Sequence, residues 1–96
     1  MREKEFRAWL EYVKNLAPRP INDYVSRCKR VMRCLQINLD EEFKKDKGHY
    51  LLKLLADSDN SILIDRLEFS EDADIPSGLA SLKSAVNSYF EFCQYP

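Results

Sequence analysis

The sequence predicts an all-α protein, a single compact bundle of four to five helices, on three observations. Apolar residues recur at steps of three and four along most of the chain, which is the spacing of one helical face. Hydrophobic residues make up 45% of the 96 residues, enough for one core. The two Gly and four Pro are too few for a chain of many strands and turns. We therefore expect residues 1–96 to form one helical domain. The stop directly after a strong helix predicts that this domain is the N-terminal part of a longer protein.

The first two helices are expected at residues 2–15 and 20–35. Trp9 should anchor the first helix in the core, because its large apolar area is worth most when buried. Pro18 and Pro20 end that helix, and Pro20 suits the first turn of the next one. The second helix has an apolar stripe on one side and a polar, mostly basic face on the other. That polar face and its flanks comprise Arg19, Asn22, Asp23, Ser26, Arg27, Lys29, Arg30 and Arg33.

Shorter elements are expected in the middle of the chain. Asp40 is predicted to cap a short turn at residues 41–45, which Gly48 then ends. A further helix should follow and end at about Asp57. A strand is conceivable at residues 62–69, whose apolar positions alternate imperfectly. The chain offers it no partner strand, so a short helix is predicted there.

The last helix, expected at residues 76–93 with Ser77 as its N-cap, is the element around which the chain is organised. Its apolar face is predicted to hold Leu79, Leu82, Ala85, Val86, Tyr89, Phe90 and Cys93. Its opposite face is small and polar, with Lys83, Ser84, Asn87 and Glu91. Two interpretations remain open for this polar face: a plain solvated surface, or a surface that lies against a polar partner such as a nucleic-acid groove.

Charge is divided unevenly along the chain. Residues 1–35 hold nine Lys and Arg against four acids, whereas the remainder holds six bases and twelve acids. Four of these cations, Arg27, Lys29, Arg30 and Arg33, lie within seven residues of the second helix. Such a division fits an anion-binding N-terminal half, two halves that attract each other, or two solvated surfaces. A cationic helix face likewise fits either phosphate contacts or a solubilising exposed surface.

Catalytic and metal-binding motifs are missing from the sequence. It has no nucleophile elbow, no Walker loop, no dinucleotide-binding glycine pattern and no zinc-ligand set. His49 is the only histidine, and the three cysteines lack the C-x-x-C spacing of a metal site. We expect Cys28 and Cys93 to be small core hydrophobes. The chain is therefore predicted to be non-enzymatic, without a metal or another cofactor.

Nothing in the sequence predicts export or a membrane span. The start, MREKEFRAWLEYV, has charges threaded through its apolar positions and does not read as a signal peptide. No apolar run approaches the roughly 20 residues needed to cross a bilayer. A cytoplasmic location without membrane contact is the expectation.

Two stretches, PRPINDYVSRCKRVMRCL and SGLASLKSAVNSYFEFC, together resemble one known family. They are similar to the second and last helices of the SAM-like, N-terminal core-binding domain of tyrosine recombinases (the phage integrase family). In that family a proline-containing turn enters the second helix. Here Ile21 to Tyr24 supplies this entry, with Pro20 in place of the usual Thr. The S-A-L-x-x-F-Y-x-F-like run of the last helix is matched by Ser84, Ala85, Val86, Tyr89, Phe90 and Phe92.

The resemblance implies a SAM-like bundle that clamps one side of duplex DNA, with a separate catalytic domain on the other side. The family's DNA contacts come mainly from its second and last helices. Carried over to this chain, they indicate Arg19, Asn22, Ser26, Arg30 and Arg33, then Ser81, Lys83, Ser84 and Asn87. Arg27 and Lys29 flank the first group and join the predicted DNA-binding set.

The main functional hypothesis is a non-catalytic DNA-binding domain of an integrase-like, recombinase-like or nuclease-like protein, with double-stranded DNA as its partner. The alternative is a protein–protein interaction module, or an N-terminal accessory domain of a nuclease or of another protein, with a protein partner or a downstream catalytic domain. A scaffold without any ligand is the third hypothesis.

Overall fold

The computed structural model describes residues 1–95, and within that range it contains six α-helices and no strand. They are α1 (Glu3–Tyr12), α2 (Pro18–Leu35), α3 (Leu39–Asp46), α4 (His49–Leu55), α5 (Ser61–Arg66) and α6 (Ile75–Gln94). The predicted all-α class is confirmed. The helices outnumber the expected four to five because the turn predicted at residues 41–45 is a full helix, α3. None of the helices in this range is long and apolar enough to cross a membrane.

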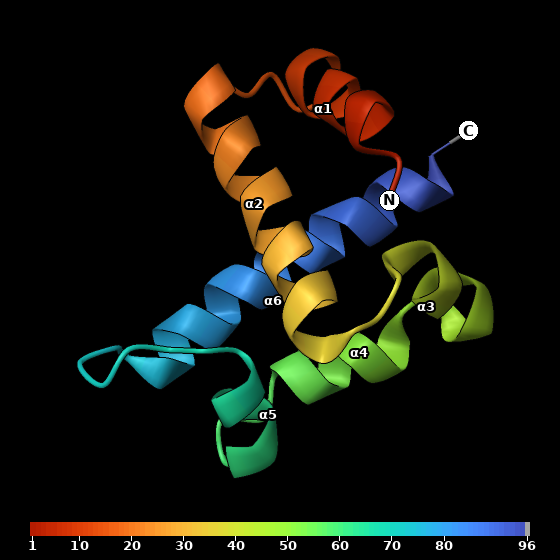
Figure 1. Cartoon of the computed structure of the whole chain (residues 1–96). Helices are drawn as coiled ribbons and strands as arrows, with labels where there is room; N and C mark the ends of the chain where they lie inside the picture. Colours follow the sequence, from red (N-terminus) through yellow and green to blue (C-terminus); the bar gives the residue numbers. More distant parts are fainter. Residues whose placement is uncertain (96) are drawn as a thin grey trace.

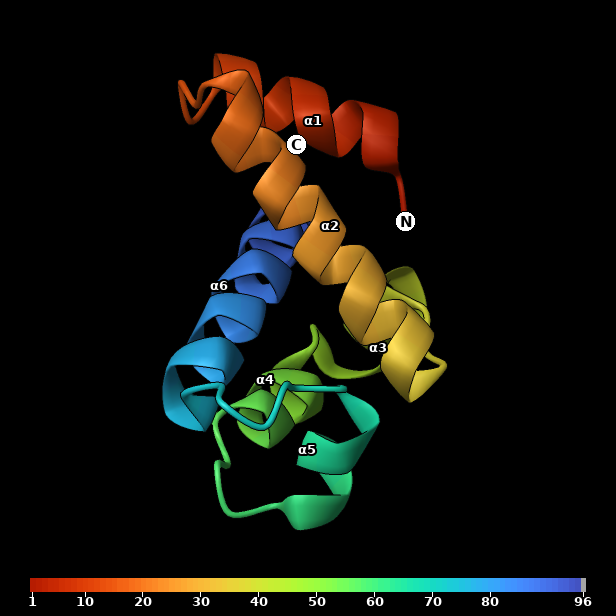
Figure 2. The ribbon, with the colours of Figure 1, turned by 60° about the vertical axis from the view of Figure 1, so that its left-hand side comes forward.

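The two long helices, α2 and α6, cross each other and form the frame of the molecule (Figure 1). At the crossing, the Cys28 thiol donates to the Ala85 carbonyl oxygen across 3.4 Å. Helices α1, α3 and α4 also pack on α6, and α5 packs on α2. Figure 2 shows α1 at one end of this frame and α4 and α5 at the other. The molecule measures 36 × 30 × 18 Å, and its shortest dimension equals about two helix layers.

Helix α6 supplies much of the core, as the sequence predicted, with one correction. Its buried side chains are Leu79, Leu82, Ala85, Val86, Tyr89, Phe90 and Phe92. Cys93, expected on this face, is only half-buried, and Phe92 is buried instead. The reason is α1, whose Phe6 and Trp9 rings lie 5.6 Å and 5.8 Å from the Phe92 ring. These aromatic contacts extend the buried face of α6 by one position. Trp9 is a core residue, as predicted.

Two helix caps differ from those that the sequence predicted. The N-cap of α3 is Asn38, whose side chain accepts from the backbone N–H groups of Asp40 and Glu41. Asp40 does not act as the cap. Its carboxylate accepts a hydrogen bond of 2.5 Å from the Tyr89 hydroxyl of α6 and thereby fastens α3 to the core. The N-cap of α6 is Asp74, which accepts from the backbone N–H of Ser77.

The first two helices also have different bounds from those expected. Helix α1 ends at Tyr12 rather than at residue 15, and Asn15 adopts a left-handed conformation with φ of 57°. Val13, which continues the apolar spacing of Phe6, Trp9 and Leu10, is therefore 41% exposed. Helix α2 begins at Pro18, which occupies the first helical position that proline tolerates.

Helix α3 ends at Asp46 with Lys47 as its left-handed C-cap, and Gly48, the predicted break, follows as the N-cap of α4. The structure shows why a glycine is needed there. Its φ is +79°, a conformation that residues with a Cβ rarely adopt. A Cβ at this position would also lie 2.1 Å from the Phe90 ring. The backbone of Gly48 therefore packs directly on Phe90 of α6.

Candidate nucleic-acid interface

The polar face of α2 is exposed because the opposite side of the helix is fixed in the core. Ile21, Val25, Cys28 and Val31 are the buried residues of this helix, and they follow the three-and-four spacing of one face. Arg19, Asn22, Ser26, Lys29 and Arg33 are exposed, and Arg27 and Arg30 are half-buried. The amphipathic pattern of the sequence thus presents the predicted basic residues on one side of an 18-residue helix.

Five of the predicted residues surround one open hollow of about 490 Å³. They are Ser26, Arg27, Lys29, Arg30 and Arg33, all from α2. The lining contains four cations and a hydroxyl group and no carboxylate. Cationic and hydroxyl side chains are the groups that proteins use to contact phosphate oxygens. The hollow is the strongest candidate anion site among residues 1–95.

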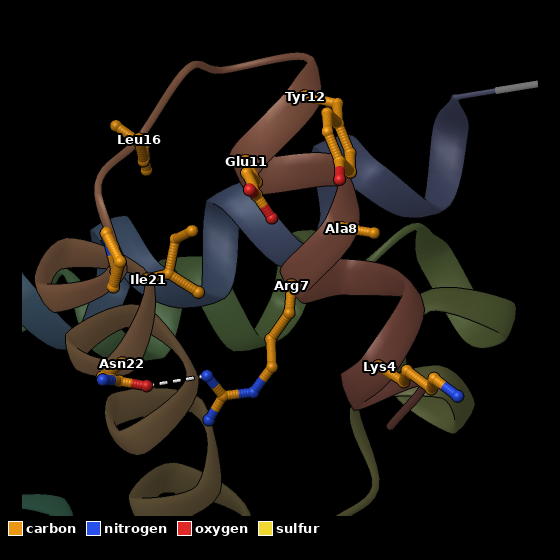
Figure 3. A pocket seen from close by; sticks show the side chains of 9 residues that line it. Lys4, Arg7, Ala8, Glu11, Tyr12, Leu16, Ile21 and Asn22 are labelled. Atoms are coloured by element: carbon orange, nitrogen blue, oxygen red, sulfur yellow. Dashed lines mark hydrogen bonds between the residues drawn. The ribbon is translucent and has the colours of Figure 1, made fainter.

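Lys29 and Asn22 are tied to α1 by a polar bridge. Lys29 Nζ lies 2.6 Å from Glu3 Oε1, and Arg7 Nε donates to the other Glu3 oxygen across 3.0 Å. Arg7 Nη1 also donates to Asn22 Oδ1 across 2.7 Å (Figure 3). Lys29 and then Arg7 hold the pKa of the Glu3 carboxyl below its ordinary value. This bridge was not predicted, although Glu3 and Arg7 stand four residues apart, which is the spacing of an ion pair on one helix.

Arg30 is a structural residue as well as a candidate contact. Its Nε and Nη2 donate to the carbonyl oxygen of Leu67 across 3.1 Å and 2.6 Å. Its guanidinium lies 4.9 Å from the centre of the Phe69 ring. Phe69 in turn lies so close to α6 that a Cβ on Gly78 would come within 2.5 Å of the ring. Arg30 therefore holds the segment after α5 between the two long helices.

Arg33 lies beside the same segment. Its Nη1 is 3.3 Å from Glu68 Oε2, and Glu68 is in the left-handed conformation with φ of 59°. Arg19 and Arg27, in contrast, form no ion pair or side-chain hydrogen bond with the described part of the chain. The basic face thus contains three cations with internal partners, Lys29, Arg30 and Arg33, and two without, Arg19 and Arg27.

The residues predicted on the last helix do not join this hollow. Ser81, Ser84 and Asn87 are exposed on α6. Lys83 is half-buried and lines a separate hollow of about 250 Å³, together with Leu55, Ala56 and Pro76. The structure therefore gathers the α2 part of the predicted DNA-binding set into one site and leaves the α6 part as a scattered polar surface.

The charge division between the two halves of the chain has a partly internal explanation. Arg33 with Glu68 and Lys14 with Glu91 join the basic half to the acidic half, the latter pair at 2.6 Å. Attraction between the halves was one of the interpretations left open by the sequence, and these pairs support it. Arg19 and Arg27 take no part in it.

No known protein family, curated protein or solved structure matches the chain.

Proposed function

We propose that the chain is a non-catalytic DNA-binding domain that contacts the phosphate backbone of duplex DNA through α2. What supports the proposal most is the hollow on α2, with four cations and one hydroxyl group in its lining and no carboxylate. From Arg19 to Arg33 the helix rises by about 21 Å. That length corresponds to about six base-pair steps, so one face of the helix is long enough to contact several phosphates.

The internal ties of this face are compatible with phosphate binding. Lys29 with Glu3 and Arg33 with Glu68 are exposed ion pairs, and pairs of this kind contribute about 0–1 kcal/mol to stability. Phosphate oxygens can therefore replace the carboxylates at small cost. The Arg30 guanidinium is already oriented by the Leu67 carbonyl through Nε and Nη2, which leaves Nη1 as a fixed donor for phosphate.

The domain that this proposal describes is of the SAM-like kind found in front of the catalytic domain of tyrosine recombinases. The same chemistry suits an accessory domain of a nuclease. Asn22, Ser81, Lys83, Ser84 and Asn87 then serve as secondary contacts to the backbone or to base edges.

Binding of a fluorescent random-sequence duplex at two salt concentrations tests the proposal. The Arg19→Gln/Arg27→Gln variant should bind at least about tenfold more weakly at low salt. The slope of log affinity against log salt should fall by about two, because two phosphate contacts are lost. Neither side chain has an internal partner in residues 1–95, so the circular dichroism spectrum and the unfolding midpoint should be unchanged.

The matched control is Lys53→Gln/Arg66→Gln, which removes the same charge from exposed positions on α4 and α5. It should lower affinity by less than about twofold. If the wild-type chain does not bind the duplex at low salt, or if both variants lose affinity equally, the α2 assignment is wrong.

A second candidate function, a protein-interaction module, has its own observation. Tyr50 and Ile62 are 62% and 74% exposed, and both line an apolar hollow of about 320 Å³ between α2, α4 and α5. Its apolar lining also includes Leu35, Ile37, Leu51, Leu54 and Leu63. An apolar interface of this kind keeps its affinity as salt is added, whereas phosphate binding weakens steeply.

A further inference from the structure

A second hollow, of about 420 Å³, lies between α1 and the start of α2. Figure 3 shows Arg7 and Glu11 of α1 in its middle, with Tyr12, Ala8 and Lys4 along one rim and Leu16, Ile21 and Asn22 along the other. Lys4, Ala8 and Tyr12 follow one another at steps of four residues, so they form a row along α1. We call this hollow the α1–α2 groove.

The chemistry of the α1–α2 groove suits a flat, neutral heterocycle. Tyr12 is 76% exposed and offers the face of an aromatic ring for stacking. Ala8, Leu16, Pro18 and Ile21 add apolar surface. The charged lining residues are Lys4, Arg7 and Glu11, and Arg7 shares the nearby Glu3 carboxylate with Lys29. A phosphate would meet the Glu11 carboxylate, so the groove is a poor anion site.

Hydrogen-bonding groups are also in place around the groove. The Asn22 side chain accepts from Arg7 through Oδ1, which leaves its amide N–H groups free to donate. Glu11 is exposed and forms no ion pair in residues 1–95, so its oxygens can accept from an exocyclic amino group. An acceptor beside an aromatic face suits recognition of an unstacked base, and the Asn22 amide lies on the opposite rim of the groove.

The groove adjoins the phosphate-binding surface. Asn22 lines the α1–α2 groove, and Ser26, one helical turn further along α2, lines the cationic hollow. The helical rise between them is about 6 Å, so the groove and the cationic hollow are neighbours along α2. A strand whose phosphates lie on α2 can therefore place one base in the groove.

We infer that the α1–α2 groove binds one unpaired nucleobase of the DNA, stacked on Tyr12 and hydrogen-bonded to Glu11. The inference rests on the proposed function, because α2 holds the phosphates of the same strand. A paired base presents only its edge to a protein, so the groove gives the domain a preference for DNA with an extrahelical or single-stranded nucleotide. Bases with an exocyclic amino group are preferred over thymine because Glu11 is an acceptor.

The test compares three duplexes of the same sequence: fully paired, with one extrahelical cytosine, and with an abasic residue in place of that cytosine. Wild-type chain should bind the cytosine duplex about tenfold more tightly than the abasic one. Tyr12→Ala should abolish this difference, and Tyr12→Phe, which keeps the ring, should retain it. The control Tyr50→Ala removes another exposed tyrosine, on α4 and outside the groove. It should leave the difference between the cytosine and abasic duplexes unchanged.

The outcomes separate the inference from the proposed function. Equal affinity for the cytosine and abasic duplexes, with binding still lost in Arg19→Gln/Arg27→Gln, overturns the inference and leaves the α2 surface in place. A preference for cytosine that survives in Tyr12→Ala also overturns it. Absence of binding to all three duplexes at low salt overturns the proposed function and the inference together. Replacement of the extrahelical cytosine by thymine should reduce the preference, and an equal preference for both bases contradicts the role of Glu11.

Discussion

The two long helices bury each other at their crossing and differ in what they expose. Helix α6 is largely apolar and buries seven side chains along 20 residues, whereas α2 buries four along 18. The polar face of α6 carries serines, Asn87 and Glu91, and its single lysine, Lys83, is half-buried in a separate hollow. The exposed face of α2 carries five cations. Although the resemblance to recombinase domains treats both as DNA-contacting helices, in this chain α6 is chiefly a core element and α2 is the candidate binding surface.

The largest expected effect concerns the core role of α6. Phe90→Ala removes a ring that is 1% exposed and that packs on Phe43 and on the Gly48 turn. It should lower the free energy of unfolding by about 3–5 kcal/mol, measured by denaturant titration. Asn87→Ala, on the exposed side of the same helix, should change it by less than about 0.5 kcal/mol. A cost below about 1 kcal/mol for Phe90→Ala would break the distinction between the two helices.

A smaller effect sharpens the description of α2. Glu68→Gln frees Arg33 from its carboxylate partner and should raise affinity for duplex DNA by about two- to threefold at low salt. The matched control is Glu71→Gln, which removes an exposed charge from the same segment. Glu71 forms no ion pair within residues 1–95. This variant should raise affinity less. Equal gains in the two variants would mean that the net charge of the segment sets the affinity, and that the ion pair between Glu68 and Arg33 does not by itself reduce it.

The smallest effect is expected on α6. Lys83→Gln should weaken duplex binding by less than about twofold, because Lys83 lines a hollow near the end of α4 and lies outside the cationic hollow. Arg27→Gln removes the same charge from α2 and should weaken binding by about three- to tenfold in the same titration. If Lys83→Gln costs as much affinity as Arg27→Gln, α6 contributes to DNA binding as strongly as α2, and the comparison fails.

Arg30 illustrates how far the site can be predicted from sequence. Its position in a cationic helix face predicts a phosphate contact, but its guanidinium also holds the Leu67 carbonyl and the Phe69 ring. Charge reversal at Arg30 would therefore disturb the packing of the segment between α5 and α6 as well as any DNA contact. Arg19 and Arg27 are the cleaner positions for substitution, and periodicity alone gives no means of separating them from Arg30.

The helix caps and the packing of α1 on α6 were harder to predict from the sequence, for a related reason. Asn38 and Asp40 are both good capping residues, as are Asp74 and Ser77. Asp40 is used by Tyr89, 49 residues away, so Asn38 becomes the cap. Phe92 replaces Cys93 in the core because Phe6 and Trp9 cover it. For Asp40 and Phe92 a partner distant in sequence decides between two residues that are locally equivalent, whereas Asp74 caps α6 through local bonds from the Ser77 N–H and hydroxyl.

The sequence by itself determined the helical class, the apolar faces of α2 and α6, the break at Gly48 and the concentration of cations on α2. These features depend on spacing and backbone preference, which act over a few neighbouring residues. Only the tertiary structure decided which cations are tethered, because Arg30 meets Leu67 and Arg33 meets Glu68 across more than 30 residues of chain. The α1–α2 groove likewise exists only because α1 packs on α2, which places Tyr12 and Glu11 of α1 and Asn22 of α2 around one hollow. Long-range contacts of this kind follow from how the helices pack, which no local pattern specifies.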